Sequence, residues 1–108
     1  MEIKDNEYVR TFSGGILTKK DLDNLLKFTN YEINEIVKSH AKRVSELVEV
    51  GDYVNGIKVI NILHENGYIK FKVYNGEIND YELVSILTHE MYDNNVFVVE
   101  DELEWMEM

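Results

Sequence analysis

The chain has 108 residues, of which 44% are hydrophobic; this is typical of one folded domain and excludes a disordered segment. It holds no cysteine, which excludes disulfide bonds and thiolate metal sites. The formal net charge is −10, and a field of that sign repels nucleic acid and anionic lipid, so we expect neither as a direct partner. No hydrophobic run approaches the roughly 20 residues of a membrane span, and residues 1–5 lack a signal-peptide pattern, so we expect a cytosolic protein.

The acidic charge gathers in the second half of the chain. Residues 1–50 carry eight basic and nine acidic side chains, whereas residues 51–108 carry three basic and twelve acidic ones. Lys72 is the last basic residue, and ten carboxylates follow it. Such a stretch attracts basic protein surfaces, although a solvated face that only keeps the protein in solution is the plain alternative.

The first fifty residues are predicted to form one strand and two helices. Residues 8–12 read as a short strand, and Gly14-Gly15 marks the turn after it. Thr18 is placed as an N-cap, with Asp21 in capping-box register, before a short helix that carries leucines on one face. A longer helix is predicted to start at residue 29 or 30 and to end near residue 50. Its hydrophobic residues recur at helical spacing: Ile33, Ile36, Val37, Ala41, Val44, Leu47 and Val48.

After residue 50 the pattern changes to strands. Three Asn-Gly pairs, at 55–56, 66–67 and 75–76, suit tight type I′ hairpin turns. Between these pairs, residues 57–63 and 68–74 are predicted to be strands, and the second alternates strictly, with Ile69, Phe71 and Val73 on one face. Further along, residues 83–87 are predicted to form a strand, residues 88–93 one helical turn capped by Thr88, and residues 96–99 a final strand.

Together these elements predict an α+β fold, in which an N-terminal segment of two helices packs on a small, SH3-like antiparallel β-barrel. We expect residues 1–50 to form a short strand and a helical hairpin, and residues 51–99 to form a barrel that shares its core with the helices. Residues 100–108 are expected to be an acidic extension.

The sequence carries no catalytic or metal-binding motif. His40, His64 and His89 share no ligand spacing, and each is expected to be structural, with His40 partly buried. Asp52 follows a glycine and is expected to accept hydrogen bonds from nearby backbone amides in a turn. Sequence distance leaves a catalytic triad assembled in space open, but we expect no enzyme, no metal and no cofactor.

Two segments carry a family resemblance. Residues 36–56, which end in ELVEVGDYVNG, and later residues 83–92 (LVSILTHEMY) resemble a group of short uncharacterised proteins encoded by phages and prophages of Gram-positive bacteria. The resemblance covers roughly residues 36–99, and it implies a phage origin and a fold of a helix with a small barrel, but no activity and no functional residues. By analogy of class, small acidic phage proteins include anti-CRISPR inhibitors.

The charge and the resemblance favour a non-enzymatic protein of the host cell cytoplasm. It is expected to bind and inhibit a basic, nucleic-acid-binding host or defence protein, in the manner of an anti-CRISPR protein that mimics nucleic acid. The expected contact residues are nine carboxylates and one tryptophan: Glu77, Asp80, Glu82, Glu90, Asp93, Glu100, Asp101, Glu102, Glu104 and Trp105.

Two alternatives stay open at this point. The first is a phage structural or assembly protein that associates with itself, as a homodimer for example, through the predicted helix stripe or through a tyrosine face. The second is a nucleic-acid-binding regulator that uses Tyr68, Lys70, Lys72 and Tyr74, because aromatic rings alternating with lysines can stack bases.

Overall fold

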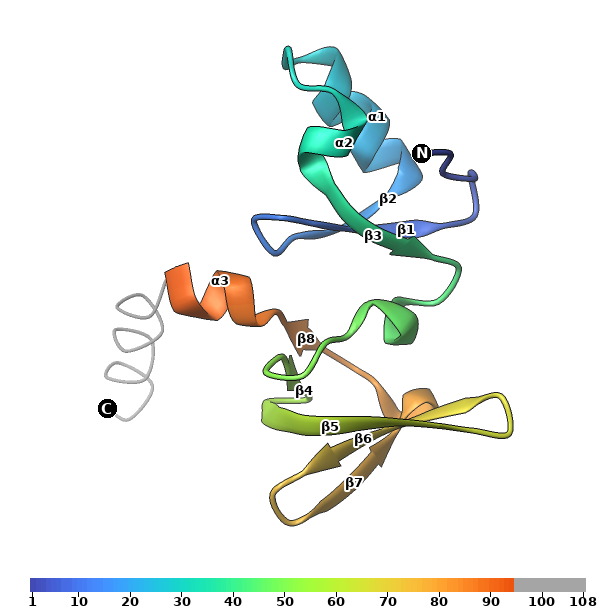
Figure 1. The fold of residues 1–108 in the computed structure, drawn as a ribbon, viewed down its shortest axis with the longest axis vertical. Helices are drawn as coiled ribbons and strands as arrows, with labels where there is room; N and C mark the ends of the chain where they lie inside the picture. Colours follow the sequence, from blue (N-terminus) through green and yellow to red (C-terminus); the bar gives the residue numbers. More distant parts are fainter. Residues whose placement is uncertain (95–108) are drawn as a thin grey trace.

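The computed structural model describes residues 1–94, which form two antiparallel sheets placed one above the other (Figure 1). The upper sheet has the strand order β2-β1-β3 and consists of β1 (Tyr8–Thr11), β2 (Ile16–Thr18) and β3 (Val37–Ala41). The lower sheet has the order β7-β6-β5-β4-β8 and consists of β4 (Tyr53–Val54), β5 (Ile57–Glu65), β6 (Tyr68–Val73), β7 (Gly76–Asn79) and β8 (Ile86–Leu87). Between the strands lie α1 (Lys19–Lys27), α2 (Ile33–Ile36) and the 3-10 turns η1 (Val44–Leu47) and η2 (Asp80–Glu82), and α3 (His89–Asn94) follows β8.

The upper sheet begins as the sequence predicts. β1 is confirmed as a strand, and the turn after it leads into β2, an additional short strand, with Gly14 at φ +99°. Thr18 is confirmed as the N-cap of α1, because its hydroxyl accepts a hydrogen bond from the Asp21 amide over 3.1 Å. Leu22 of α1 is fully buried, so this helix covers the sheet with its leucine face.

The long helix predicted for residues 29–50 is wrong. The chain forms α2, β3 and η1 in succession instead. β3 pairs along β1, with Val37 opposite Thr11 and Ala41 opposite Tyr8, and this long-range pairing outweighs the local helical preference. The hydrophobic spacing fits one long helix as well as the observed short elements. In the structure Val37 and Val48 are buried in two different clusters, so these residues do not lie on one helical stripe.

The predicted hairpin at the centre of the lower sheet is confirmed. β5 and β6 meet at Asn66-Gly67, whose φ angles of +49° and +80° are those of a type I′ turn. The predicted inward face of β6 is buried, with Ile69, Phe71 and Val73 exposed by 2%, 0% and 5%. The third Asn-Gly pair differs, since Gly76 already begins β7.

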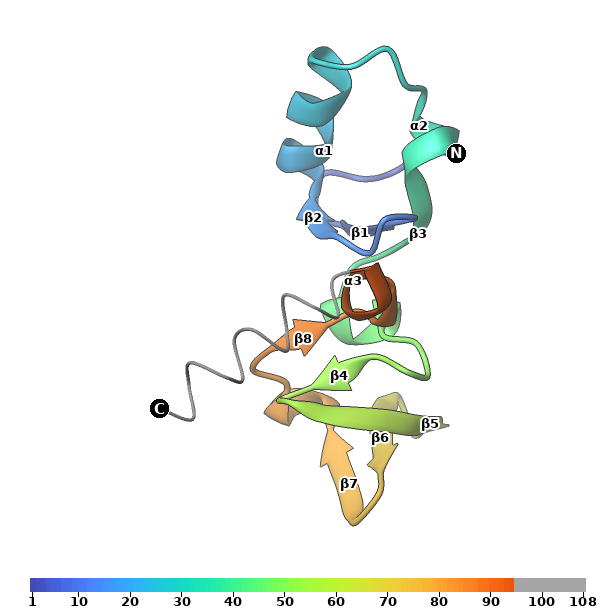
Figure 2. The same cartoon turned by 90° about the vertical axis from the view of Figure 1, so that its left-hand side faces the viewer.

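The predicted SH3-like barrel is wrong. β7 and β8 lie at opposite edges of the lower sheet, so the sheet stays open. β7 is a strand that the sequence pattern misses, and the strand predicted for residues 83–87 is limited to Ile86–Leu87, because η2 turns the chain before it. The prediction of two N-terminal helices packed on a barrel is wrong as well, because the lower sheet is open and forms no barrel in the described residues. In this part of the chain α1 and α2 cover the upper sheet (Figures 1 and 2).

The predicted helical turn after Thr88 is confirmed as α3. The amide of Met91 donates to the Thr88 hydroxyl over 3.4 Å. The Thr88 hydroxyl in turn donates to the carbonyl oxygen of Gly14 over 2.7 Å. Both views place α3 at the level between the two sheets (Figures 1 and 2). The strand predicted for residues 96–99 and the extension 100–108 lie outside the described residues.

Each sheet has a hydrophobic cluster of its own. Val9, Leu22 and Val37 belong to the upper cluster, whereas Val59 and Phe71 belong to the lower one. Polar side chains are buried at the level between the clusters, and the most deeply buried of them are Arg10, Asp52 and Thr88. The two sheets are therefore joined largely through polar contacts, which is an unusual way to connect two halves of a small domain.

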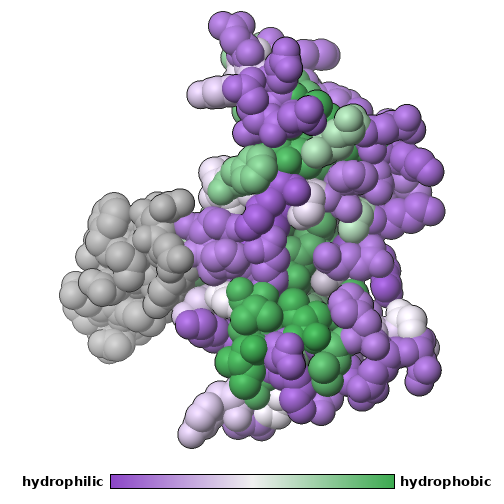
Figure 3. Space-filling view, in the orientation of Figure 1, coloured by the Kyte–Doolittle hydropathy of each residue, from purple (hydrophilic) through white to green (hydrophobic). Residues whose placement is uncertain are grey.

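Hydrophilic side chains dominate the visible surface, but hydrophobic ones gather over the lower sheet (Figure 3). Exposed hydrophobic residues of this half include Ile57, Ile60 and Val84. Within residues 1–94, no helix has the length and hydropathy that a membrane crossing requires.

We predict that Gly14→Ala destabilises the fold more than Gly67→Ala. Both positions have positive φ, at +99° and +80°, where an alanine costs about 1–2 kcal/mol. A Cβ on Gly14 would also lie 2.5 Å from the Thr88 hydroxyl and 2.9 Å from the Met91 amide, whereas a Cβ on Gly67 meets no atom within 4 Å. Urea denaturation should show an additional loss of about 1–3 kcal/mol for Gly14→Ala. Equal losses would contradict the close approach of α3 to the β1–β2 turn.

Candidate functional site

Arg10 lies in the middle of the molecule because β1 is the central strand of the upper sheet. Side chains alternate along a strand, so Val9 faces the upper cluster and Arg10 faces the opposite way, toward the lower sheet. The Arg10 side chain is 0% exposed. A guanidinium can be buried to this extent only when counter-charges and hydrogen-bond acceptors surround it.

Asp52 supplies a counter-charge to Arg10 and is also fully buried. Its Oδ2 and Oδ1 atoms lie 2.5 Å and 2.9 Å from Nη1 and Nη2 of Arg10, in a bidentate pair. The amides of Glu49 and His89 donate to the same carboxylate over 2.7 Å and 2.9 Å. Burial raises the pKa of Asp52, but Arg10 and these amides outweigh burial, so the pKa lies below its usual range. The predicted amide bonds of Asp52 are thus confirmed, and the arginine is an additional partner.

Further charges surround this pair. Glu90 of α3 accepts a hydrogen bond from Nη2 of Arg10, and its other oxygen lies 2.6 Å from Nζ of Lys38. Lys38 also reaches Oε1 of Glu49 over 3.0 Å. Burial raises the pKa of Glu90, but the hydrogen bonds from Lys38 and Arg10 bring it down to about 2, and Glu90 in turn raises the pKa of Lys38. Glu90 and Lys38 are therefore both charged at neutral pH. We call these residues the Arg10 network: Arg10, Lys38, Glu49, Asp52, His89 and Glu90.

The Arg10 network is not completely satisfied. Nη1 of Arg10 donates to the carbonyl oxygen of Leu47 over 2.9 Å, but Nε is buried without a hydrogen bond among the described residues. It lies 3.5 Å from Oε2 of Glu49, which is one third exposed and also bonds to Lys38. The network thus ties together β1, β3, the segment before β4, and α3.

His89 and Asp52 form a pair that resembles half of a catalytic triad. Nδ1 of His89 lies 2.9 Å from Oδ1 of Asp52, an arrangement that orients a histidine base in many hydrolases. The other ring nitrogen, Nε2, lies 3.4 Å from Oε1 of Glu90 and 3.7 Å from Oε1 of Glu49, so it faces carboxylates and not a nucleophile. Because Asp52 and Glu90 are held ionised, neither acts as a general acid near neutral pH. Among the described residues, the ring nitrogens of His89 thus lie beside the Arg10 guanidinium and three carboxylates.

Part of the same cluster brings possible metal ligands together. Glu49, His89 and Glu90 offer ligand atoms that lie within 4.8 Å of one another. However, Lys38 already bonds to Oε1 of both glutamates, so a metal ion would have to displace a lysine ammonium. The three residues therefore do not fit a metal ion.

Of the carboxylates predicted to contact a partner, the four whose side chains are described accept hydrogen bonds within the chain. Glu90 belongs to the Arg10 network, and Oε1 of Glu77 accepts from Lys72 over 3.0 Å. Asp80 and Glu82 shape η2, because they accept from the amides of Ile69 and Asn79 over 3.1 Å and 2.9 Å. The side chains of the other six predicted residues lie outside the described part: Asp93, Glu100, Asp101, Glu102, Glu104 and Trp105.

The tyrosine–lysine face proposed for nucleic acid is present but mixed in charge. Tyr68 and Tyr74 are exposed by 59% and 95%. The lysine beside each of them bonds to an acid, since Lys70 lies 3.4 Å from Oε2 of Glu65 and Lys72 bonds to Glu77. The upper sheet holds His40, on β3. This histidine is partly buried as predicted, and its Nδ1 lies 3.2 Å from the Glu7 carboxylate.

Exposed aromatic rings gather at the other end of the molecule, where the chain passes between α1 and α2. Two adjoining hollows of about 370 Å³ and 470 Å³ share Thr29, Tyr31 and Glu35. Tyr31 and Phe12 are exposed by 61% and 55%. We call the two hollows together the aromatic groove, which is lined by Thr11, Phe12, Ser13, Leu25, Thr29, Asn30, Tyr31, Glu35 and Ile36.

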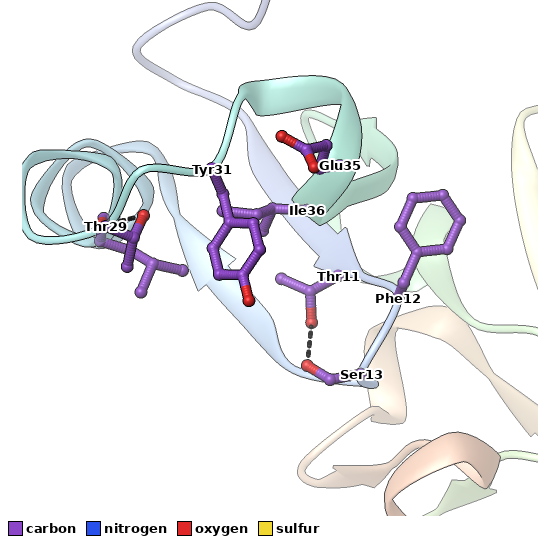
Figure 4. Close-up of a pocket in the computed structure, with 8 residues that line it drawn as sticks. Thr11, Phe12, Ser13, Thr29, Tyr31, Glu35 and Ile36 are labelled. Atoms are coloured by element: carbon purple, nitrogen blue, oxygen red, sulfur yellow. Dashed lines mark hydrogen bonds between the residues drawn. The ribbon is translucent and has the colours of Figure 1, made fainter.

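The geometry of the aromatic groove is set by β1 and α2. The Phe12 amide donates to the Ile36 carbonyl oxygen over 3.0 Å, which joins the end of β1 to the end of α2. In Figure 4 the Tyr31 ring lies on one side of Thr11 and the Phe12 ring on the other. Among the described residues that line the groove, Glu35 carries the only charge. Sequence reasoning missed this groove, because residues 29–36 were assigned to a long helix.

We predict that Arg10→Leu is among the most destabilising single substitutions in the chain. It leaves the buried Asp52 carboxylate without its counter-charge, which costs about 3–5 kcal/mol. Lys72→Leu is the matched control, because it removes a cation from the partly exposed pair with Glu77 and should cost less than about 1 kcal/mol. Urea denaturation measures both values. Similar losses for the two variants would contradict the central role of Arg10.

We predict that the free energy of unfolding falls as the pH is lowered from about 4.5 to about 2. The pKa of Glu90 in the folded chain is depressed to about 2, so its stabilisation is present above its unfolded pKa of 4.5 and is lost as the pH drops. Linkage sets this loss at up to about 3 kcal/mol. In Glu90→Gln the decline should be smaller by that amount, whereas Glu65→Gln, far from Arg10, should follow the wild type. Superimposable profiles for all three proteins would refute the assignment.

Comparisons with protein-family models, curated protein sequences and solved structures found no match to this chain. The resemblance to short phage-encoded proteins therefore stays a prediction from the sequence.

Proposed function

We propose that this chain is a non-enzymatic binding protein whose partner is a basic protein, which it inhibits by covering a basic surface. The resemblance to phage-encoded proteins supports a bacterial host cytoplasm as the place where this happens. Recognition rests on carboxylates, as it does when proteins compete with nucleic acid for a basic surface.

The observation that carries the proposal is a charge surplus that the chain does not neutralise itself. The sequence has 21 acidic and 11 basic residues, and every basic residue lies within the described part. Six of the basic residues are already engaged in ion pairs inside the chain: Arg10, Lys19, Lys38, Arg43, Lys70 and Lys72. The remaining acidic surplus is therefore available to a partner, and it steers association with a positively charged one.

Exposed carboxylates outside the predicted contact set support the proposal as well. Glu77 and Glu90 have partners within the chain, whereas Glu32 and Glu35 are exposed at the end of the upper sheet and have no ion pair among the described residues. This end also carries the exposed rings of Phe12, Phe28 and Tyr31. Exposed aromatic rings beside acids are typical of a protein-binding surface.

The lack of an enzymatic role is supported by the state of the titratable groups. Asp52 accepts from Arg10 and from two backbone amides, and Glu90 from Arg10 and Lys38. A carboxylate whose oxygens already accept from such donors and whose pKa is lowered is a weak general base, and it is not a general acid near neutral pH.

We predict that the immobilised chain captures a basic protein from a cytoplasmic lysate of a Gram-positive host in a fixed ratio. Because exposed charges are screened by salt, the affinity should fall about tenfold or more when the salt concentration rises from about 50 mM to about 300 mM. Mass spectrometry of the eluate and titration of the purified partner at both salt concentrations provide the measurement.

The control is an unrelated acidic domain of equal net charge, which should not capture the same protein in a fixed ratio. A partner that is neutral or acidic would contradict the proposal. Binding that is indifferent to ionic strength would contradict it as well.

A further inference from the structure

We propose that the aromatic groove is a binding site for a single arginine side chain of the partner. This inference rests on the proposed function, because it names the site and the chemical group through which a basic partner is recognised.

Glu35 provides a fixed negative charge in the groove. Its Oε1 atom accepts from the Glu32 amide over 2.9 Å, in a capping box at the start of α2. One carboxylate oxygen thus anchors the side chain, and the other is free to accept from a ligand. The site does not have to freeze a flexible glutamate when it binds, which lowers the entropic cost of recognition.

The aromatic rings provide flat surfaces beside this charge. Tyr31 and Phe12 both line the groove and remain more than half exposed. Figure 4 shows the Tyr31 hydroxyl directed toward the turn that carries Ser13. A cation is attracted to the face of such rings, and a planar guanidinium also stacks on them.

The hydroxyl groups of the groove can accept hydrogen bonds from a ligand. Thr29 donates its hydroxyl hydrogen to the Leu25 carbonyl oxygen over 3.0 Å, so its lone pairs face outward as acceptors. Thr11 and Ser13 share a hydrogen bond of 3.0 Å, and Thr11 accepts from the Gly15 amide over 2.9 Å. Lysine and arginine side chains do not line the described groove, although Lys27 lies on the neighbouring helix α1. A site with one carboxylate and several hydroxyl groups fits a ligand that is rich in donors.

Arginine matches this arrangement better than lysine does. A guanidinium presents five N–H donors in one plane, so it can bond to Glu35 and to hydroxyl groups while its face rests on a ring. A lysine ammonium is a compact, strongly hydrated charge that cannot stack in this way. The two hollows, of about 370 Å³ and 470 Å³, leave room for the aliphatic part of the side chain as well.

The test uses the full chain and a short capped peptide with one central arginine between glycines. We expect weak binding with nuclear magnetic resonance shifts at the groove residues, and no binding of the citrulline peptide, which has the same shape without the charge. Glu35→Gln and Tyr31→Ala should each weaken binding about tenfold. Glu35→Gln keeps the capping box, because glutamine also fits this position, and Tyr31 is largely exposed, so both variants should stay folded.

The matched controls are Glu65→Gln and Tyr74→Ala on the lower sheet, which should bind the peptide like the wild type. Equal binding of a lysine peptide would overturn the assignment of a guanidinium. If the wild type and both groove variants capture the same basic partner with equal affinity, the groove proposal fails while the proposed function stands. If the wild type captures no basic protein, the proposed function fails first.

Discussion

The bidentate ion pair between Arg10 and Asp52 is the constraint on which the rest of the structure depends. Both side chains are fully buried between two separate hydrophobic clusters, so neither can lose the other without leaving an uncompensated charge. The pair forms only when the segment before β4 docks against β1, and Glu90 completes it only when α3 docks there too. A buried ion pair adds little net stability over hydrophobic packing, but it specifies how the sheets are joined.

This constraint also explains where charge is available for function. Arg10 and Lys38 use the carboxylates of Asp52 and Glu90, which sequence alone marks as part of an acidic half. The acids that remain without ion pairs in the described part include Glu32 and Glu35, at the far end of the upper sheet. Opposite charges thus neutralise one another in the Arg10 network, whereas in the aromatic groove a carboxylate lies among exposed rings. The proposed recognition of an arginine depends on the aromatic groove and not on the Arg10 network.

The features that sequence reasoning predicts well are those with local causes. The β5–β6 hairpin follows from Asn66-Gly67 and from strict alternation in β6, and α1 follows from the Thr18 cap. The Arg10–Asp52 pair joins residues 42 positions apart, and no local pattern reveals it. One signal was present, because an arginine in the middle of a short predicted strand must either be exposed or find a buried partner. The prediction of a long helix is wrong because the pairing of β3 with β1 is also non-local. The aromatic groove was missed for the same reason, since residues 29–36 were assigned to that helix.

The central claim is that the Arg10 network makes two separate hydrophobic clusters unfold as one unit. Amide hydrogen exchange of Val9 in the upper sheet and Phe71 in the lower sheet, measured in increasing urea, tests it most directly. The account predicts that both amides exchange with one shared opening free energy in the wild type, and with two different ones in Arg10→Leu. Two different opening free energies already in the wild type would contradict it.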